Sequence, residues 1–440
     1  MRRCGAGVID RFIPIPTIGY DMIELGDEYE GIPVFEVGGS VRDDMRGVDS
    51  QDVDLAVAEV DGRELRERGF EKIDTSDAFP VFHDSQGREV AICREEVSTG
   101  SGHKEFDVEP VSPVVPAAEA IERDLARRDF TVNAMARNVR TGKLHDPFDG
   151  QQDLKDGVIR HVSLEEDALR VLRAARFAAR LEARVADETK DVMTRLAPRM
   201  MSLPGERIRM ELEKVLVQAD HPSQFFTVLA ETEALQFAFP EIDRLRSVPA
   251  GPEQYHAEGT AFAHTMMVLE EVKRALGASE LALLMALYHD VGKGKTPTSE
   301  YPHHYAHGEY GLDIINAAND RLKFSNKQLD AMKVASKEHM RLKNLEEMKE
   351  KTVYDTWQRI DDHYVEMKVL MRADALGRVP RGSFDEALYA ERFLRAEQAM
   401  NAISGQDLID DGCEFEGEKF GKELRDRRIS HMKHLRDQKH

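Results

Sequence analysis

Cysteine and long apolar runs are scarce in this chain. Three cysteines in 440 residues, Cys4, Cys93 and Cys413, are odd in number and far apart, which excludes a disulfide framework and favours a reducing compartment. No apolar run approaches the roughly 18 residues of a membrane helix, and the start of the chain lacks a signal-peptide core. These absences predict a cytoplasmic protein without a membrane partner, and they permit a homo-oligomer.

Basic residues are also fewer than acidic residues. The chain has 61 Lys and Arg against 82 Asp and Glu, and the net charge of -21 argues against nonspecific nucleic-acid binding. The charge is nevertheless segregated, because arginines crowd between Arg160 and Arg209, and the last 22 residues carry eight basic and three acidic side chains. This segregation permits a polyanionic partner.

The chain is too long for one ordinary core, so we expect several domains. Short β-rich runs alternate with helix-like segments up to about residue 149, and the remainder looks almost wholly helical. The pattern predicts an α+β protein, with a boundary in the Pro/Gly-containing stretch 248–254. The expected parts are an extension of unknown role (1–33), a head with a mixed sheet (34–150), a helical region (151–247), a second helical domain (255–380) and a helical tail that is basic at its end (381–440).

A glycine pair follows the first apolar run, in VFEVGGSVRD. We expect a strand that ends at Gly38 and Gly39, with Ser40 capping the helix that follows. Backbone amides at such a helix start bind anions, and Arg42 adds a fork of donors for phosphate. A plain turn is the alternative interpretation.

Two aspartates follow at a spacing of two. On a strand, Asp52 and Asp54 project from one face, and paired carboxylates suit the Mg²⁺ ions that serve phosphoryl transfer. Glu89, in the strand-like run REVAIC, is a candidate third acid, although an exposed strand residue is the simpler interpretation. The glycine pair followed by Asp-x-Asp favours nucleotide chemistry over a solvated acidic strand.

Arginines recur at helical spacing in EEDALRVLRAARFAAR, 165–180. One face of the expected helix carries Glu166, Arg170, Arg173, Arg176 and Arg180. A solvated face is the ordinary interpretation, but four arginines with little counter-charge repel one another unless an anion binds there. Asp167 and Arg170 offer an acceptor and a donor fork that could hydrogen-bond a base edge.

These motifs together resemble a known family. GGSVRD, the Asp-x-Asp pair, RRDFTVNAMA (127–136), DPFDG (146–150) and EDALRVLRAARF occur in the order typical of class II tRNA nucleotidyltransferases, the CCA-adding enzymes, which share their head with bacterial poly(A) polymerases. The resemblance implies a polymerase-β-like head in which Asp52 and Asp54 hold catalytic Mg²⁺. It further implies that Asp129 and Asn133 lie near the ribose and that Asp167 and Arg170 select the base. The implied triphosphate site consists of Gly38, Gly39, Ser40, Arg42, Arg173 and Arg176.

Histidines mark a second constellation. His264, His289-Asp290 and Asp374 follow the order of an HD phosphohydrolase motif, in which imidazoles and carboxylates hold a divalent metal. Such histidines can equally be satisfied core residues. Lys293 and a further group of histidines could add ligands or phosphate contacts, or could lie on the surface; these histidines are His303, His304, His307 and His339.

This second constellation extends the resemblance to one bacterial branch of the CCA-adding enzymes, which carries an HD domain with phosphatase, 2′-nucleotidase and 2′,3′-cyclic phosphodiesterase activities. The resemblance implies an enzyme that adds CCA to tRNA from CTP and ATP, with a second metal-dependent hydrolytic site. Imidazole ligands suggest Ni²⁺, Mn²⁺ or Co²⁺ there. The alternatives are a poly(A) polymerase, an enzyme that adds only CC or only A, and an RNA-binding protein that has lost catalysis.

Overall fold

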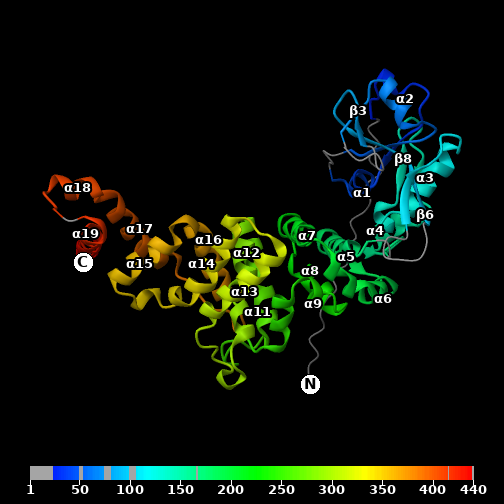
Figure 1. Ribbon diagram of the computed structural model, residues 1–440. Coiled ribbons are helices and arrows are strands. Elements are labelled where there is room, and N and C mark those ends of the chain that lie inside the picture. Colours follow the sequence, from blue (N-terminus) through cyan, green and yellow to red (C-terminus); the bar gives the residue numbers. More distant parts are fainter. Residues whose placement is uncertain are drawn as a thin grey trace. The chain divides into compact units, whose positions relative to one another are not determined.

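The computed structural model describes residues 23–48, 53–73, 81–98, 106–164, 167–414 and 416–438. The chain divides into two compact units between Leu196 and Ala197, here called the N-terminal unit and the C-terminal unit. The N-terminal unit contains a mixed sheet with helices, and the described part of the C-terminal unit is helical (Figure 1). This architecture confirms the expected α+β class, with a sheet-containing head followed by helical domains.

A seven-stranded sheet organises the N-terminal unit, in the order β3-β4-β5-β2-β1-β8-β9. Only β2 and β5 run parallel, and the other neighbouring pairs are antiparallel. Its strands are β1 (Val34–Val37), β2 (Leu55–Val57), β3 (Glu71–Lys72), β4 (Val81–His83), β5 (Glu89–Ile92), β8 (Ala136–Asn138) and β9 (Leu144–His145). Two smaller pairs join β6 (Arg94–Ser98) to β7 (Phe106–Pro110) and β10 (Val158–Ile159) to β11 (Arg184–Val185).

Both faces of the seven-stranded sheet are covered, because its central strands are apolar on both sides. Leu55 and Val57 of β2 belong to one buried cluster, whereas Ala56 belongs to the other. Ile121 and Leu125 cover the second face from helix α3. The helices of this unit are α1 (Gly39–Met45), α2 (Gly62–Glu67), α3 (Ala117–Ala126), α4 (Gly150–Lys155), α5 (Leu169–Leu181) and α6 (Asp187–Leu196), with a 3-10 turn η2 (Thr131–Asn133).

The turn between β1 and α1 depends on Gly38. Its φ of 72° lies in the left-handed region that favours glycine, and a side chain there would also collide with the guanidinium of Arg128. Gly38 itself is the N-cap of α1, which begins at Gly39. The prediction that Ser40 caps this helix is therefore wrong: Ser40 lies inside the first turn, and its hydroxyl donates to the carbonyl of Val37.

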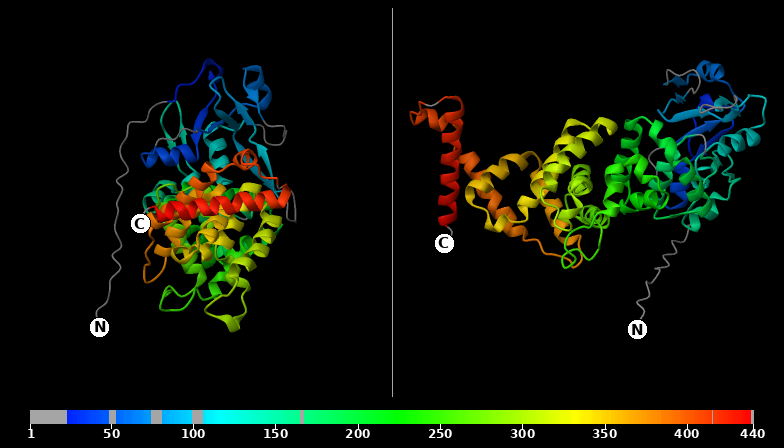
Figure 2. Two further views of the ribbon diagram at one scale, coloured as in Figure 1. Left: turned by 90° about the vertical axis from the view of Figure 1, so that its left-hand side faces the viewer. Right: turned by 60° about the horizontal axis from the view of Figure 1, so that its bottom comes forward.

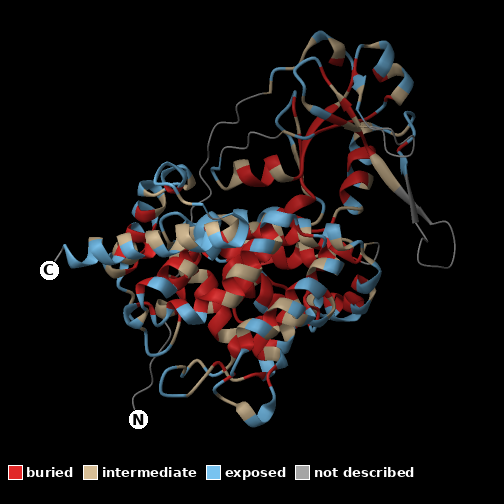
Figure 3. Ribbon diagram, turned by 60° about the vertical axis from the view of Figure 1, so that its left-hand side comes forward, coloured by how far each residue is buried: buried red, intermediate tan, exposed pale blue. Residues whose placement is uncertain are grey.

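The C-terminal unit is a stack of helices whose inner faces are buried and whose outer faces are exposed (Figure 3). Helix α12, with the sequence ELALLMALY, is apolar almost all round and lies at the centre, in contact with α11, α14 and α16. The C-terminal helix α19 packs against α15 and α17 (Figure 2). The principal helices are α7 (Gly205–Gln218), α8 (Ser223–Glu231), α9 (Leu235–Ala238), α10 (Pro240–Asp243), α11 (Ala261–Arg274), α12 (Glu280–Tyr288), α13 (His307–Leu322), α14 (Asn326–Leu342), α15 (Glu350–Ile360), α16 (Tyr364–Leu376), α17 (Glu386–Ala402), α18 (Gly405–Asp410) and α19 (Gly417–Asp437), with a 3-10 turn η5 (Val291–Lys295).

Candidate active sites

The sheet register brings the glycine turn and the acidic motif of the N-terminal unit together. The amide of Val37, directly before the turn, donates to the carbonyl of Asp54 at 3.1 Å, and Asp54 is exposed. Leu55 pairs with Val90 in the parallel ladder, so Asp54 and Glu89 precede paired residues on neighbouring strands. Asp52 lies outside the described residues. The metal-binding roles of all three acids stay predictions.

A buried polar network joins the glycine motif, the RRDFTVNAMA motif and α5. Arg42 donates to the amide oxygen of Asn133, whose amide nitrogen donates to Asp129 at 3.1 Å. The Arg173 guanidinium donates to the other oxygen of Asp129 at 2.7 Å. Burial opposes the ionisation of Asp129, but Arg173 and Asn133 outweigh it and hold the pKa of this carboxyl below its usual range. Four residues predicted from separate motifs therefore meet in one charged cluster.

Asp43 is a further member of this cluster that the sequence analysis missed. It accepts two hydrogen bonds from Arg42, at 2.9 and 2.8 Å, and a third from Arg180 at 3.0 Å. Its carboxylate is an internal counter-ion for arginines of α1 and α5. The signal for it was its position directly after Arg42 in GGSVRD.

The remaining arginines of α5 are not a solvated face. Arg176 is 4% exposed, and the ring of Phe177 lies 4.2 to 5.5 Å from the guanidinium carbons of Arg42, Arg173 and Arg176. Arg170 donates to the backbone carbonyls of Ser163 and Arg127, at 2.6 and 2.8 Å. The Asp167 carboxylate accepts from the amide of Leu169 at 2.8 Å. These contacts fix Asp167 and Arg170 at the start of α5, and their base-selecting role stays a prediction.

The predicted histidines and aspartates of the C-terminal unit converge on one buried centre, here called the HD centre. His264 comes from α11, His289 and Asp290 from the end of α12, and Asp374 from α16. His307 from α13 and His339 from α14 join them. All six residues are at most 4% exposed. The surface interpretation of His307 and His339 is therefore wrong.

Asp290 lies between two pairs of imidazoles. Its Oδ2 lies 3.2 Å from Nε2 of His289 and 3.8 Å from Nε2 of His264. Its Oδ1 lies 3.2 Å from Nε2 of His307 and 3.4 Å from Nε2 of His339. Asp374 extends the first pair, with Oδ1 at 3.2 Å from Nε2 of His264. The ligand atoms thus form two groups of three, which are His264, His289 and Asp374, and Asp290, His307 and His339.

Several buried polar atoms of this centre have ion-pair neighbours but no well-aligned hydrogen bond among the described residues. They are both carboxylate oxygens of Asp290, Oδ2 of Asp374, Nε2 of His289 and Nδ1 of His264. Buried polar atoms that lack well-formed hydrogen bonds are costly, and convergent imidazole and carboxylate atoms are the donor set of divalent transition metals. The residues present therefore fit a divalent metal.

Two lysines accompany the aspartates. Nζ of Lys293 lies 2.7 Å from Asp290, and Nζ of Lys343 lies 2.9 Å from Asp374. Burial opposes ionisation of both carboxyls, but these ammonium groups and the neighbouring imidazoles hold the pKa of each well below its usual range. Lys293 is 5% exposed, so the surface interpretation of this lysine is wrong.

The other two candidate histidines lie apart from the ligand groups. His303 is exposed. His304 is 1% exposed and bonds Thr296 at 2.6 Å and the carbonyl of Pro249 at 2.8 Å. His304 is therefore a satisfied core residue, and the surface interpretation of this histidine is wrong.

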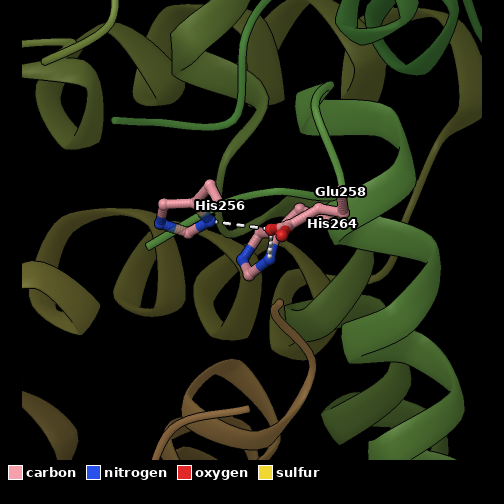
Figure 4. Close-up of side chains that lie close together, drawn as sticks. All are labelled: His256, Glu258 and His264. Carbon is pink, nitrogen blue, oxygen red and sulfur yellow. Dashed lines mark hydrogen bonds and ion pairs between the residues drawn. The ribbon is translucent and has the colours of Figure 1, made fainter. Parts of the chain in front are cut away.

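Beside the HD centre, the sequence analysis missed a third group that consists of His256, Glu258 and His264 (Figure 4). Oε1 of Glu258 lies 2.7 Å from Nδ1 of His256 and 3.2 Å from Nδ1 of His264. Burial opposes ionisation of Glu258, but its hydrogen-bonding partners outweigh burial and lower its pKa to about 2. The ionised Glu258 carboxylate therefore lies on the Nδ1 side of the His264 ring. Glu258 could not be identified from the sequence, because it lies in a loop where no periodic pattern marks a functional residue.

Comparison with known proteins identifies the parts of the chain. The Poly A polymerase head domain family matches residues 34–160, and the family described as the probable RNA and SrmB-binding site of polymerase A matches 184–245. The HD domain family matches 261–378. The first match covers Arg42, Asp129 and Asn133 of the buried cluster, whereas α5 lies between the first and second matches. The third match covers the HD centre.

Relatives and solved structures resemble the chain over most of its length. The multifunctional CCA protein of Xanthomonas oryzae pv. oryzae is 35% identical over 90% of this chain and 97% of that protein. The protein of the same name from Vibrio vulnificus is 36% identical over 91% and 98%. The structure of the Bacillus stearothermophilus CCA-adding enzyme in complex with CTP aligns with a TM-score of 0.63 at 20% identity, and covers 93% of this chain and 94% of that one.

Taken together, the head, the buried arginine cluster, the HD centre and these relatives define a tRNA nucleotidyltransferase with an HD domain. Within that class, the chain belongs to the family of multifunctional CCA proteins. The family resemblance deduced from the motifs is confirmed. Across the described ranges, no helix has both the length and the apolar character that a bilayer crossing requires.

Proposed function

We propose that this enzyme adds CCA to the 3′ end of tRNA from CTP and ATP without a nucleic-acid template. The observation that carries the proposal is the buried cluster in which Arg42, Asn133, Asp129 and Arg173 unite three motifs of the N-terminal unit. Further support comes from similar structures described as CCA-adding enzymes with tRNA, ATP and CTP.

The proposal assigns a role to each group of residues in the N-terminal unit. The arginines of α5 bind the triphosphate, since guanidinium groups hold phosphate in a bidentate manner. Asp167 and Arg170 select the base through hydrogen bonds to its edge. Asp52 and Asp54 would hold Mg²⁺, which when bound neutralises charge on the reacting phosphate.

The test is addition to a tRNA that lacks its 3′ end. Each nucleotide is supplied alone and in combination, and the products are sequenced. We expect C, C and A in order, whereas adenosine tracts would indicate a poly(A) polymerase and an incomplete end would indicate a partial enzyme. Asp54→Ala should abolish addition, and Asp191→Ala, at an exposed position of α6, should not. Tight tRNA binding without addition would indicate an RNA-binding protein.

We propose a second activity, a metal-dependent phosphohydrolase in the C-terminal unit. It is carried by the HD centre, in which the two oxygens of Asp290 face separate pairs of histidines. The two groups of ligand atoms would hold divalent metal, and an imidazole-rich donor set favours Ni²⁺, Mn²⁺ or Co²⁺ over Mg²⁺. When bound, such ions supply Lewis acidity toward a phosphoryl oxygen. The substrates proposed are 2′,3′-cyclic nucleotides, 2′-nucleotides and other phosphomonoesters.

This activity is tested on 2′,3′-cyclic AMP and 2′-AMP with each divalent metal in turn. We expect hydrolysis with the transition metals and little with Mg²⁺. Asp290→Asn and His289→Ala should remove hydrolysis and leave CCA addition unchanged. If the wild type hydrolyses neither compound with any metal, or if the activity survives His289→Ala, the proposal is wrong.

We also propose that the enzyme works in the cytoplasm and that its functional parts are a head (34–150), a nucleotide-selecting and tRNA-binding helical region (151–247), an HD domain (255–380) and a helical tail (381–440). Support for the division comes from the separate family matches over 34–160, 184–245 and 261–378.

A further inference from the structure

The four histidines of the HD centre all direct Nε2 toward the ligand groups and Nδ1 away from them. Three of them make a hydrogen bond from Nδ1 to a backbone carbonyl: His289 to Ala286 at 2.7 Å, His307 to His304 at 2.8 Å, and His339 to Ser336 at 2.9 Å. A carbonyl oxygen can only accept, so Nδ1 carries the proton in each of these rings. The lone pair of Nε2 is therefore free to bind a metal.

His264 differs from the other three. No described backbone group bonds its Nδ1, which instead lies 3.2 Å from Oε1 of Glu258, within ion-pair distance but without the alignment of a full hydrogen bond (Figure 4). On the other side of the same ring, Nε2 lies 3.2 Å from Oδ1 of Asp374. His264 is thus the one imidazole of the centre whose outer neighbour is a carboxylate.

We propose that Glu258 is a positioning residue of the HD centre: its carboxylate accepts the Nδ1 proton of His264, which fixes the tautomer and makes Nε2 the strongest nitrogen ligand. Outer carboxylates orient and strengthen histidine ligands in this way in many metal sites. The inference rests on the proposed phosphohydrolase, because it requires that the centre binds metal. It assigns a role to a residue outside both ligand groups.

Glu258 is itself firmly held. Its side chain is 3% exposed, and its Oε2 accepts the amide proton of Val379 at 2.9 Å. Val379 lies three residues beyond the end of α16, the helix that carries Asp374. Glu258 therefore connects the loop before α11, which supplies His264, to the segment that follows α16. It thereby links two of the three elements that supply this ligand group.

The experiment is a titration of the full-length protein with Mn²⁺ alone, measured by calorimetry after removal of bound metal. Glu258→Gln keeps the shape of the side chain and one acceptor for Val379, but loses the charge. We expect Mn²⁺ affinity to fall 10- to 100-fold at one of the sites, as is usual when an outer partner is lost, with the number of bound ions unchanged. Substituting Co²⁺ should give an altered visible spectrum, which reports the changed ligand field.

The matched control is Glu253→Gln, which makes the same charge change at an exposed position of the same loop and should bind Mn²⁺ like the wild type. Glu258→Asp should restore part of the lost affinity, because it restores the carboxylate. His256→Ala should leave the number of bound ions unchanged.

Several results would overturn the assignment. Equal affinities of Glu258→Gln and the wild type would show that the carboxylate does not act on His264. Complete loss of one ion in both Glu258→Gln and His256→Ala would make these two residues ligands. A melting temperature of metal-free Glu258→Gln far below that of the wild type, without rescue by Glu258→Asp, would make the role merely structural. A wild type that binds no Mn²⁺ would instead overturn the proposed centre itself.

Discussion

Among single residues, His304 shows how a buried imidazole outside the ligand groups couples stability to pH. Burial and the nearby Lys293 ammonium lower its pKa to about 4. The folded pKa is below the ordinary value of about 6.5, so the folded protein disfavours the charged ring. The contribution of the neutral ring to the free energy of unfolding is complete above about pH 6.5 and is lost as the pH falls toward 4. Between pH 7 and pH 5 the free energy of unfolding therefore decreases by on the order of 2 kcal/mol.

We therefore predict that His304→Gln reduces the loss of stability between pH 7 and pH 5. The neutral amide can still donate to the carbonyl of Pro249 but cannot become protonated. The measurement is the free energy of unfolding from denaturant titrations at the two pH values, with the same change at exposed His303 as control. An equal pH dependence in His304→Gln and the wild type would contradict the prediction.

At the level of elements, the start of α5 and the residues just before it are predicted to select the base, whereas Arg173, further along the helix, is predicted to bind the triphosphate. Arg173→Ala should raise the KM for CTP and ATP alike by tenfold or more, since a hydrogen bond to a charged group is worth roughly 1.5–3 kcal/mol. Asp167→Ala and Arg170→Ala should instead raise the incorporation of UTP or GTP relative to CTP and ATP, because a bidentate base contact contributes roughly 1–3 kcal/mol of discrimination.

Steady-state kinetics with each nucleotide measures both effects, and Arg184→Ala, at an exposed position just beyond α5, is the control. Unchanged selectivity in both Asp167→Ala and Arg170→Ala would leave α5 as a phosphate-binding helix only.

A second prediction at this scale concerns the contact of η5 with α13. A side chain at Gly292 would overlap the carbonyl oxygen of His307, the first residue of α13. Gly292→Ala should therefore push α13 away from the HD centre, lower the free energy of unfolding by roughly 1–3 kcal/mol and weaken Mn²⁺ binding. Gly421→Ala, which meets open space in α19, is the control for both measurements. Unchanged Mn²⁺ affinity would show that α13 tolerates the displacement.

The sequence predicts elements better than it predicts their contacts. The family resemblance follows from ordered motifs, and the α+β class follows from β-rich runs that give way to helical segments. The run DVDLAV predicted a strand, which the structure has at Leu55–Val57, directly after Asp54. The pairing of Arg173 with Asp129 and of Arg180 with Asp43 was not predictable, because it depends on how residues 44 and 137 positions apart meet in the fold. His307 could not be separated from a surface histidine for the same reason, because its burial depends on the packing of α13 against α14.

For the whole molecule, the two compact units predict two unfolding transitions. A ligand that binds only the folded state stabilises it by about 2.7 kcal/mol at 100 times its dissociation constant. Saturating Mn²⁺ should therefore raise the melting temperature of the C-terminal unit alone, and Asp290→Asn should abolish that shift. Differential scanning calorimetry of the full chain with and without Mn²⁺ is the measurement. A single transition, or an equal shift of both, would contradict the independence of the units.

The pairing of each candidate ligand aspartate with its own lysine bears on how the proposed hydrolytic activity could be lost during evolution. Lys293 holds Asp290 and Lys343 holds Asp374, so the loss of any one histidine leaves neither buried carboxylate without a cationic neighbour. A single substitution could therefore abolish the proposed hydrolytic activity while the helices keep their packing. In this family, an intact fold would then be a poor guide to whether a descendant still hydrolyses phosphate esters, and the histidines themselves would have to be inspected.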